Sequence, residues 1–265
     1  MKTVNGKAAI VFGAAGRGNM GQVIARRLAK EGAKVCVVGR HEDALAEIAA
    51  ELGGTYALAD ISKKSDVFAA VRKAKADFGK LELGVNATGW GLMAPTDATK
   101  EEDLDRILGI QFKGPFFFIQ ALLEAFTDGG SIIQISSATA TIQLENHAAY
   151  MGTKAGIDHV IRTVANEYGH RGIRANSISP GITDSPMAGG SFALPGFVEA
   201  FAKEYPLGRV GTSDDIAAAV LWLGSDECFM TGQNLQVNGG LTLRRNPTMA
   251  EMGEVFAKAT AHLTT

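Results

Sequence analysis

The sequence predicts an α/β fold built as a single domain, with a doubly wound sheet of seven parallel strands flanked by helices. Three observations lead to this prediction. Short β-branched runs alternate with helical stretches, as in βαβ crossover units. Apolar residues recur at three- and four-residue spacing between those runs. The 265 residues are 46% hydrophobic, enough to bury one large core, so we expect residues 1–265 to form one domain.

The predicted strands and helices alternate from the first βαβ unit onward. That unit combines the run AAIVF at Ala8–Phe12 with the helical stretch Asn19–Glu31, and the next combines Lys34–Val38 with Glu42–Leu52. Further strands are predicted at Thr55–Ala59, Leu83–Asn86, Ser131–Ile135, Arg174–Ile178 and Asn234–Val237. Further helices are predicted at Lys63–Phe78, Lys100–Phe126, Ala148–Tyr168 and Ser213–Leu223. Because ligands bind beyond the carboxyl ends of strands in such sheets, the loops that follow the strands should line one cleft.

Two segments interrupt this alternation. The Gly/Pro-rich stretch Pro180–Phe197 opens a region over residues 183–205 that fits either a lid over the cleft or an ordinary surface loop. Residues 242–265 form a C-terminal extension with an apolar stripe at helical spacing. Its members are Met249, Met252, Phe256, Ala259 and Leu263. We expect this stripe to pack against another subunit or to cover a neighbouring cleft.

Composition narrows the classes of partner. The 26 Lys+Arg and 28 Asp+Glu residues leave a formal charge of -2, so no broad basic surface is expected for nucleic acid or anionic lipid. Cys36 and Cys228 lie far apart in apolar stretches, which gives no support to a disulfide framework or a metal site. The apolar run at the N-terminus is too short for a signal peptide, and no stretch approaches the roughly 20 apolar residues of a membrane helix. We expect a cytoplasmic protein that binds neither membrane nor metal.

A glycine-rich turn follows the first predicted strand. Its candidate ligand-binding residues are Gly13, Gly16, Arg17, Gly18, Met20 and Gly21. Glycines at a strand-to-helix turn let backbone amides approach a pyrophosphate at the positive end of the helix. A structural tight turn has a similar sequence, but the position in the first βαβ unit favours dinucleotide binding.

The second strand ends at Val38-Gly39-Arg40, where an NAD-binding protein usually presents a carboxylate to the adenosine ribose. Arg40, together with Arg17 from the glycine turn, instead suits a 2′-phosphate, because guanidinium groups form charge-assisted hydrogen bonds with phosphate. This pair favours NADP(H) over NAD(H). The alternative is that both arginines only face solvent.

Tyr150 and Lys154 stand four positions apart at the start of the helix after the fifth strand, so both lie on one helical face. A lysine ammonium there can lower the pKa of the phenol and hold cofactor ribose hydroxyls. The isolated pattern is common by chance. Here it follows Ser137 at a strand end in the predicted cleft, and that combination is much rarer.

With these motifs in order, the chain from Lys7 to about Leu241 resembles the classical short-chain dehydrogenase/reductase family, and within it the ketoreductases. Asp60-Ile61 is similar to the family's adenine contact, and Asn86-Ala87-Thr88-Gly89 to its strand-end motif. Pro180-Gly181 resembles the turn on the nicotinamide side. There the resemblance implies that Ile182 donates a backbone amide to the carboxamide, and Ser185 stands where a threonine is typical.

The resemblance implies a Rossmann fold and an NADP(H)-dependent oxidoreductase that reduces a ketone to a secondary alcohol, reversibly. Tyr150 would act as general acid, Lys154 would stabilise the phenolate, and Ser137 would bind the substrate oxygen. The family also implies a homo-oligomer, a tetramer or a dimer. Two alternatives stay open: a nonredox enzyme such as an epimerase or dehydratase that retains the cofactor, and a sensor that binds NADP(H) with weak turnover.

The chain departs from the family pattern at two of these motifs. Gly13 to Gly21 spans two residues more than usual, so either Arg17-Gly18 keeps the usual pair with insertions around it, or Gly16–Gly21 forms a G-x-G-x-x-G turn. Gln111 stands where the family has a catalytic asparagine, whose amide supports a water relay to the lysine. Glutamine keeps that amide and moves it by one methylene.

Substrate identity depends on the Pro180–Phe197 loop and its neighbours, which no motif specifies. His147 fits either a position facing the substrate or an exposed loop. An apolar wall is expected from Trp90, Met93, Leu144, Met187 and Phe192, with polar groups from Glu145 and Asn146.

Overall fold

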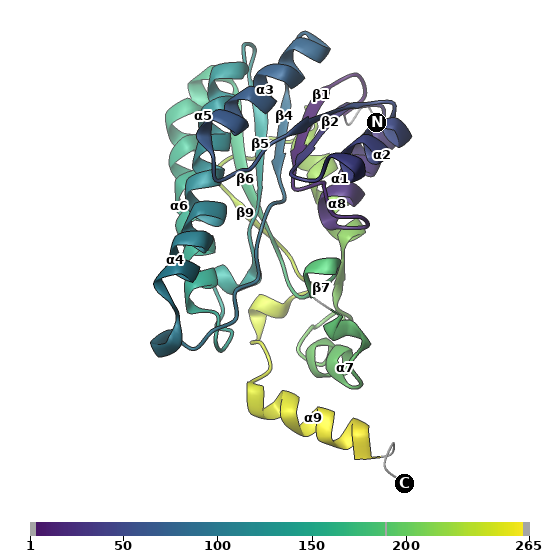
Figure 1. Cartoon of the computed structure of the whole chain (residues 1–265), viewed down its shortest axis with the longest axis vertical. Coiled ribbons are helices and arrows are strands. Elements are labelled where there is room, and N and C mark those ends of the chain that lie inside the picture. The colour runs from purple at the N-terminus through teal and green to yellow at the C-terminus, as the bar shows by residue number, and fades with distance from the viewer. Residues whose placement is uncertain (1–3, 189, 262–265) are drawn as a thin grey trace.

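Seven parallel strands form the central sheet of the computed structural model, which describes residues 4–188 and 190–261 (Figure 1). The strands are β1 (Ala8–Phe12), β2 (Lys34–Gly39), β3 (Thr55–Leu58), β4 (Leu83–Asn86), β5 (Gly130–Ile135), β6 (Ile173–Pro180) and β9 (Asn234–Val237). Their order is β3-β2-β1-β4-β5-β6-β9, and every neighbouring pair is parallel. The predicted fold class is confirmed, and the predicted strands differ from these only at their ends.

Helices cover both faces of the sheet (Figure 1). One layer contains α1 (Met20–Lys30), α2 (Glu42–Leu52) and α8 (Ser213–Gly224), and the other contains α3 (Lys64–Phe78), α5 (Gly114–Ala125) and α6 (Ala148–Tyr168). Strand β1 shows why both faces are covered. Its Ile10 and Phe12 pack into the core under α3, α5 and α6, while Ala9 and Val11 pack under α1, α2 and α8. A strand buried on both faces reads as a continuous apolar run.

The prediction of one helical stretch over Lys100–Phe126 is wrong in its middle. The chain forms α4 (Glu101–Leu108), a π-helical turn at Gly109–Lys113, and then α5. Gly114 begins α5 against the Ile61 backbone, and a Cβ there would lie 2.8 Å from the Ile61 carbonyl oxygen. The wider turn lets α4 and α5 pack against different parts of the protein. π turns of this kind often occur at functional sites.

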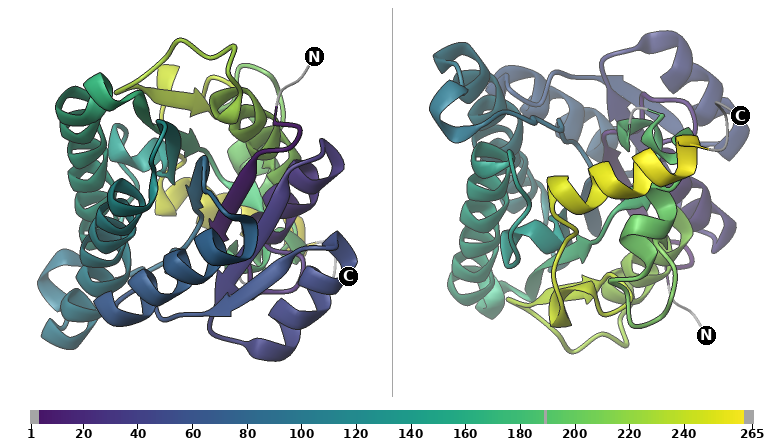
Figure 2. Two further views of the ribbon diagram at one scale, coloured as in Figure 1. Left: turned by 90° about the horizontal axis from the view of Figure 1, so that it is seen from above. Right: turned by 90° about the horizontal axis from the view of Figure 1, so that it is seen from below.

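The strand order reverses between β1 and β4, which places a crevice at the carboxyl ends of these strands. Below that crevice in Figure 1 lie α7 (Phe197–Ala202) and α9 (Met249–Ala261), which pack against each other (Figure 2). The stretch that sequence reasoning left irregular contains β7 (Thr183–Asp184), paired with β8 (Gly211–Thr212), and two short 3₁₀ turns. This second, smaller sheet was not predicted.

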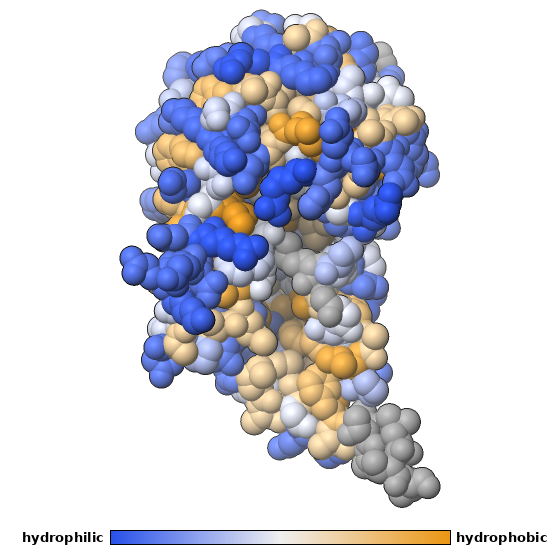
Figure 3. All heavy atoms as spheres, in the orientation of Figure 1, coloured by the Kyte–Doolittle hydropathy of each residue, from blue (hydrophilic) through white to orange (hydrophobic). Residues whose placement is uncertain are grey.

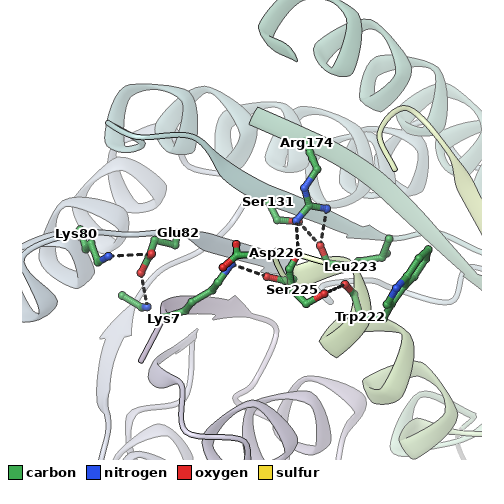
Figure 4. A network of polar contacts seen from close by, with 11 residues as sticks. Lys7, Lys80, Glu82, Ser131, Arg174, Trp222, Leu223, Ser225 and Asp226 are labelled. Atoms are coloured by element: carbon green, nitrogen blue, oxygen red, sulfur yellow. Dashed lines mark hydrogen bonds and ion pairs between the residues drawn. The ribbon is translucent and has the colours of Figure 1, made fainter. Parts of the chain in front are cut away.

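A polar network fixes the opposite end of the molecule, where the strands begin (Figure 4). Arg174 and Ser131 donate hydrogen bonds to the Leu223 carbonyl oxygen at 2.7 and 2.9 Å, and Lys7 donates to that of Gly224 at 3.0 Å. These carbonyls end α8, where helix geometry leaves them without intrahelical donors. The network therefore ties α8 to the sheet far from the crevice.

Within the described residues, no helix is both long and apolar enough to cross a membrane. Cys36 and Cys228 are both buried free thiols.

Candidate active site

Tyr150, Lys154 and Ser137 meet at the carboxyl end of β5. The strand ends at Ile135, so Ser137 lies just beyond it, while Tyr150 and Lys154 occupy consecutive turns of α6. The Lys154 ammonium donates to the Ile135 carbonyl oxygen at 2.9 Å and lies 5.6 Å from the centroid of the Tyr150 ring. Lys154 is only 4% exposed. The structure thus brings together the three residues that sequence reasoning singled out.

Hydrogen bonds hold Ser137 in place. Its hydroxyl lies 2.8 Å from the hydroxyl of Thr139 and accepts a hydrogen bond from the Thr139 backbone N–H at 3.2 Å. Its carbonyl oxygen accepts from the Ser179 hydroxyl at 3.0 Å. Because both its backbone and its hydroxyl are held, Ser137 can present the hydroxyl to a ligand without further ordering.

Burial shifts the ionisation of both α6 residues. It raises the pKa of Tyr150, an effect that the nearby Ser137 hydroxyl partly offsets. Burial also lowers the pKa of Lys154 to about 8, against the attraction of the Asp158 carboxylate. Desolvation disfavours the charged form of each group. In the free protein Tyr150 therefore keeps its proton, and Lys154 titrates close to physiological pH.

Asp158 lies one helical turn beyond Lys154 and was missed by sequence reasoning. Its Oδ2 accepts from the Ser136 hydroxyl at 2.8 Å and from the Asn234 amide at 2.5 Å. Burial raises the pKa of this carboxyl. The only sequence signal was its helical spacing from Lys154, because Asn234 is 76 residues away along the chain.

Gln111 lies behind the wall of the site rather than in it. It is 2% exposed, its Oε1 accepts from the Trp90 backbone N–H at 2.9 Å, and its Nε2 donates to the Thr153 hydroxyl at 2.9 Å. Thr153 in turn donates to the Tyr150 carbonyl oxygen at 2.7 Å. The amide therefore joins the loop after β4 to the turn of α6 that carries Tyr150. Its expected part in a proton relay stays a prediction.

The glycine turn joins β1 to α1 through Gly13 and Gly21. A Cβ on Gly21 would overlap the Gly13 carbonyl oxygen, and one on Gly13 would lie 2.7 Å from the Ala87 backbone carbon. Gly18 adopts φ of +69°. The strand and helix thus make their close contact at the two ends of the long turn. Asn19 caps α1 by accepting from the Gln22 backbone N–H at 3.0 Å.

The two arginines chosen for a 2′-phosphate differ in their surroundings. Arg40 is exposed at the end of β2. Burial would raise the pKa of the nearby Asp60 carboxyl, but hydrogen bonds from Ser62, together with the positive charge of Arg40, outweigh burial and lower it. Arg17 is paired with Glu47 of α2, its Nη2 lying 2.8 Å from Oε2.

Buried contacts shape the loops after β4 and β6. The Asn86 amide donates to the Gln134 side-chain oxygen at 2.9 Å, and Asn86 Oδ1 accepts from the Thr88 hydroxyl at 2.7 Å. At the other loop, a Cβ on Gly181 would overlap the hydroxyl of Tyr205. Glycine is therefore required where the chain leaves β6, and the turn after it is held against Tyr205, which follows α7 and donates to the Ile182 carbonyl oxygen at 3.4 Å.

These loops enclose a cavity of about 420 Å³. Many expected residues line it: Met20, Gly21, Gly89, Met93, Ser137, Leu144, Glu145, His147, Tyr150, Lys154, Pro180, Gly181, Ile182 and Ser185. Other expected residues are not among those that line it: Gly13, Gly16, Arg17, Gly18, Arg40, Asp60, Ile61, Asn86, Trp90, Gln111, Asn146 and Phe192. The side chains of Met187 and Ala259, and all of Leu263, lie outside the described part of the chain.

The far wall of the cavity comes mainly from the region over residues 183–205, expected to be a lid or a surface loop, and from the C-terminal extension. Phe201 of α7, Leu241, Asn246 and, from α9, Met249 and Met252 all line it. Met249 and Met252 belong to the stripe expected at a subunit contact or a neighbouring cleft, but the structure places both over the cleft of their own chain. Apolar side chains gather around this end of the molecule (Figure 3).

In residues 4–188 and 190–261, no group of three or more His, Cys, Asp or Glu side chains is arranged to hold a metal ion.

Comparison with known proteins adds relatives along nearly the whole chain. A family model described as enoyl-(acyl carrier protein) reductase matches residues 13–242. D-threitol dehydrogenase of Mycolicibacterium smegmatis is 34% identical over 251 residues, 91% of this chain and 95% of the relative. 3beta-hydroxysteroid dehydrogenase 1 of Eggerthella lenta is 35% identical over 250 residues, with coverage of 91% and 95%. A solved short-chain type dehydrogenase/reductase from Mycobacterium ulcerans has a TM-score of 0.89 at 29% identity, covering 97% of this chain and 98% of that one.

Proposed function

The chain belongs to the classical short-chain dehydrogenase/reductase family, and on that premise we propose that it transfers hydride reversibly between NADP(H) and a ketone or secondary alcohol. The family is one of oxidoreductases, and the relatives named above are dehydrogenases of alcohols by their names. The choice of NADP(H), and of ketone reduction as the physiological direction, rests on the arginines near the glycine turn.

The residues present fit a dinucleotide. Asn19, Met20 and Gly21 place the positive end of α1 at the cavity, where a pyrophosphate is stabilised. Gly13 and Gly21 leave no room for side chains, so the backbone itself faces this position. Arg40, exposed at the end of β2, would hold a 2′-phosphate, and Lys154 would hold ribose hydroxyls.

When bound, the reduced cofactor would supply the hydride that reduces the carbonyl carbon. Tyr150 donates its phenolic proton to the carbonyl oxygen, since burial keeps that proton on the ring until charge develops on the substrate. Lys154, beside the ring, stabilises the phenolate that forms. Ser137 donates a hydrogen bond to the same substrate oxygen from its fixed position.

One observation carries this proposal: Ser137, Tyr150 and Lys154 all line a single cavity, with Lys154 buried beside the Tyr150 ring. Lys154 is 4% exposed, and burying a lysine this completely costs free energy. Such buried charges are typical of sites that use them.

The test is a scan of NADPH and NADH against cyclic ketones, aromatic ketones, keto esters and acyl-thioester ketones, followed by nicotinamide absorbance. We expect turnover with NADPH, and a loss of about 10²- to 10⁴-fold in Tyr150→Phe with little change in NADPH affinity. Tyr168→Phe, at the other end of α6, is the matched control and should keep the wild-type rate. A near-normal rate in Tyr150→Phe, or NADPH binding without oxidation by any carbonyl, would contradict the proposal.

A further inference from the structure

The cavity has two chemically different ends. At one end lie the hydroxyls of Ser137, Thr139 and Tyr150 with the Lys154 ammonium. Apolar side chains of three segments dominate the opposite wall. They are Phe197 and Phe201 of α7, Leu241 after β9, and Met249 and Met252 of α9.

This apolar wall is preformed by a well-anchored helix. Glu251 accepts from the Thr248 backbone N–H at 2.8 Å while the Thr248 hydroxyl accepts from the Glu251 backbone N–H at 3.2 Å, a capping box that starts α9. Arg245 pairs with the same Glu251 carboxylate at 2.6 and 2.7 Å. Met252 is 9% exposed and packs with Phe201 in one apolar cluster.

The polar groups nearest α9 already serve to hold it. Glu145 Oε2 accepts from the Met249 backbone N–H at 3.0 Å. The Asn246 amide donates to the Gln143 carbonyl oxygen at 2.8 Å. Because Glu145 Oε2 and the Asn246 amide nitrogen are engaged with the chain itself, hydroxyls of a ligand placed directly against Met249 and Met252 would face mainly carbon and sulfur. A polyol bound there would lose its hydrogen bonds to water without replacement.

We infer that the substrate of this site is a ketone or secondary alcohol on a bulky apolar body, an aromatic or alicyclic ring system, and that α9 selects for it. The inference rests on the proposed hydride transfer and adds its substrate class. The reacting carbon lies at the Tyr150 end, and the ring system rests on α7 and α9. Each methylene-sized group moved from water onto such a wall gains about fourfold in affinity.

The first test compares 1-tetralone, an aromatic bicyclic ketone, with erythrulose, a short polyhydroxy ketone, using NADPH and the full-length protein. We expect kcat/KM for 1-tetralone to be higher by at least about 100-fold, the product of several such apolar groups. Activity on erythrulose equal to or above that on 1-tetralone would overturn the substrate class and leave the hydride chemistry standing.

The second test asks whether α9 carries the selection. Met249→Ser should lower the ratio of kcat/KM for 1-tetralone to that for butanone by about five- to tenfold, since butanone is too short to rely on the far wall. Glu254→Ser is the matched control, because Glu254 is an exposed residue of the same helix that does not line the cavity. An unchanged ratio in Met249→Ser would overturn the role of α9.

A binding measurement separates this inference from the proposed function. Calorimetry with Tyr150→Phe and NADPH should show 1-tetralone bound at least about tenfold more tightly than erythrulose, with the difference reduced when Met249→Ser is added. This preference without any wild-type turnover would uphold the substrate class and refute hydride transfer. Equal affinities would refute the substrate class whatever the turnover.

Discussion

Replacing Glu47 by Gln should tighten NADPH binding and leave NADH binding nearly unchanged. In the structure the Arg17 guanidinium points to α2, where its Nε and Nη2 donate to Glu47 Oε2 at 3.0 and 2.8 Å. A 2′-phosphate near the glycine turn would have to draw Arg17 away from this carboxylate. Removing the carboxylate's charge releases the guanidinium and also removes a negative charge close to the phosphate.

The size of the effect follows from the exposure of the pair. The Arg17 and Glu47 side chains are 74% and 62% exposed, so solvent screens their attraction and the ion pair is weak. Glu47→Gln should therefore tighten NADPH by about 1.4- to 5-fold. In the described part of the chain, no carboxylate lies as close to Arg40 as Glu47 lies to Arg17. A charge-assisted hydrogen bond to phosphate contributes about 1.5–3 kcal/mol, so Arg40→Ala should weaken NADPH binding by about 10- to 150-fold.

Calorimetric titration of both cofactors at low ionic strength measures this, because screening by salt reduces contacts between exposed charges. Glu51→Gln is the matched control, since Glu51 lies one turn further along α2 and pairs with Arg26 at 2.7 Å. The reasoning about Arg17 is refuted if Glu47→Gln and Glu51→Gln behave alike, or if both cofactors gain equally. Either result would return Arg17 to the role of an ordinary surface residue.

Three further predictions concern the interior. Because burial lowers the pKa of Lys154 to about 8, its ammonium is lost as the pH rises through that value. In a pH series of titrations, NADPH affinity should therefore be level below pH 8 and fall above it, by at most tenfold per pH unit. Lys154→Arg, which stays charged, should abolish this fall. Gln111→Asn restores the family's residue but should destabilise the protein by about 1–3 kcal/mol. The shorter side chain cannot both accept from the Trp90 backbone N–H and donate to the Thr153 hydroxyl. Chemical denaturation that shows no loss of stability would contradict this. Gly84→Ala should lower the free energy of unfolding by about 1–3 kcal/mol in the same assay, because its methyl group would overlap Leu122 of the packed core. Gly91→Ala, with open space around it, should lower it far less. Equal losses would refute the packing argument.

The sheet was predictable because its signal is local and repeated. Strands buried on both faces read as apolar runs, and β1 and β4 begin and end where the sequence placed them. The errors lie at strand ends, where pairing with a neighbour decides the length. Strand β6 continues to Pro180 because Ser179 and Pro180 pair with Gln236 and Val237 of β9. No property of the isolated segment specifies that partner.

The break between α4 and α5 was not predictable from periodicity. Apolar residues recur on both sides of the π turn at Gly109–Lys113, so spacing alone predicts one continuous helix. Gly109, Gly114 and Pro115 were the local signals. Their meaning depends on Ile61, whose backbone leaves no room for a side chain at Gly114.

The proposed catalytic trio was predictable for the same reason that the sheet was: two members share one helix face, and the third lies just beyond the preceding strand. The surroundings of the trio were not. Asp158 has helical spacing from Lys154, but its partners lie elsewhere in the chain, Ser136 just after β5 and Asn234 at the start of β9. Sequence reasoning finds a residue whose role is set by its own element, and misses one whose role is set by elements that meet only in the folded chain.

The substrate wall shows the consequence of that division. Cofactor chemistry relies on turns in which neighbouring residues act together, so it leaves motifs. The wall opposite Tyr150 is assembled from α7, the turn after β9 and α9, held by contacts such as the one between Asn246 and Gln143, 103 residues apart. Relatives with names as different as D-threitol and 3beta-hydroxysteroid dehydrogenase match this chain about equally, at 34% and 35% identity, so overall similarity does not specify a substrate. Variants of Tyr150 therefore report on the reaction, and variants of α9 report on what is brought to it.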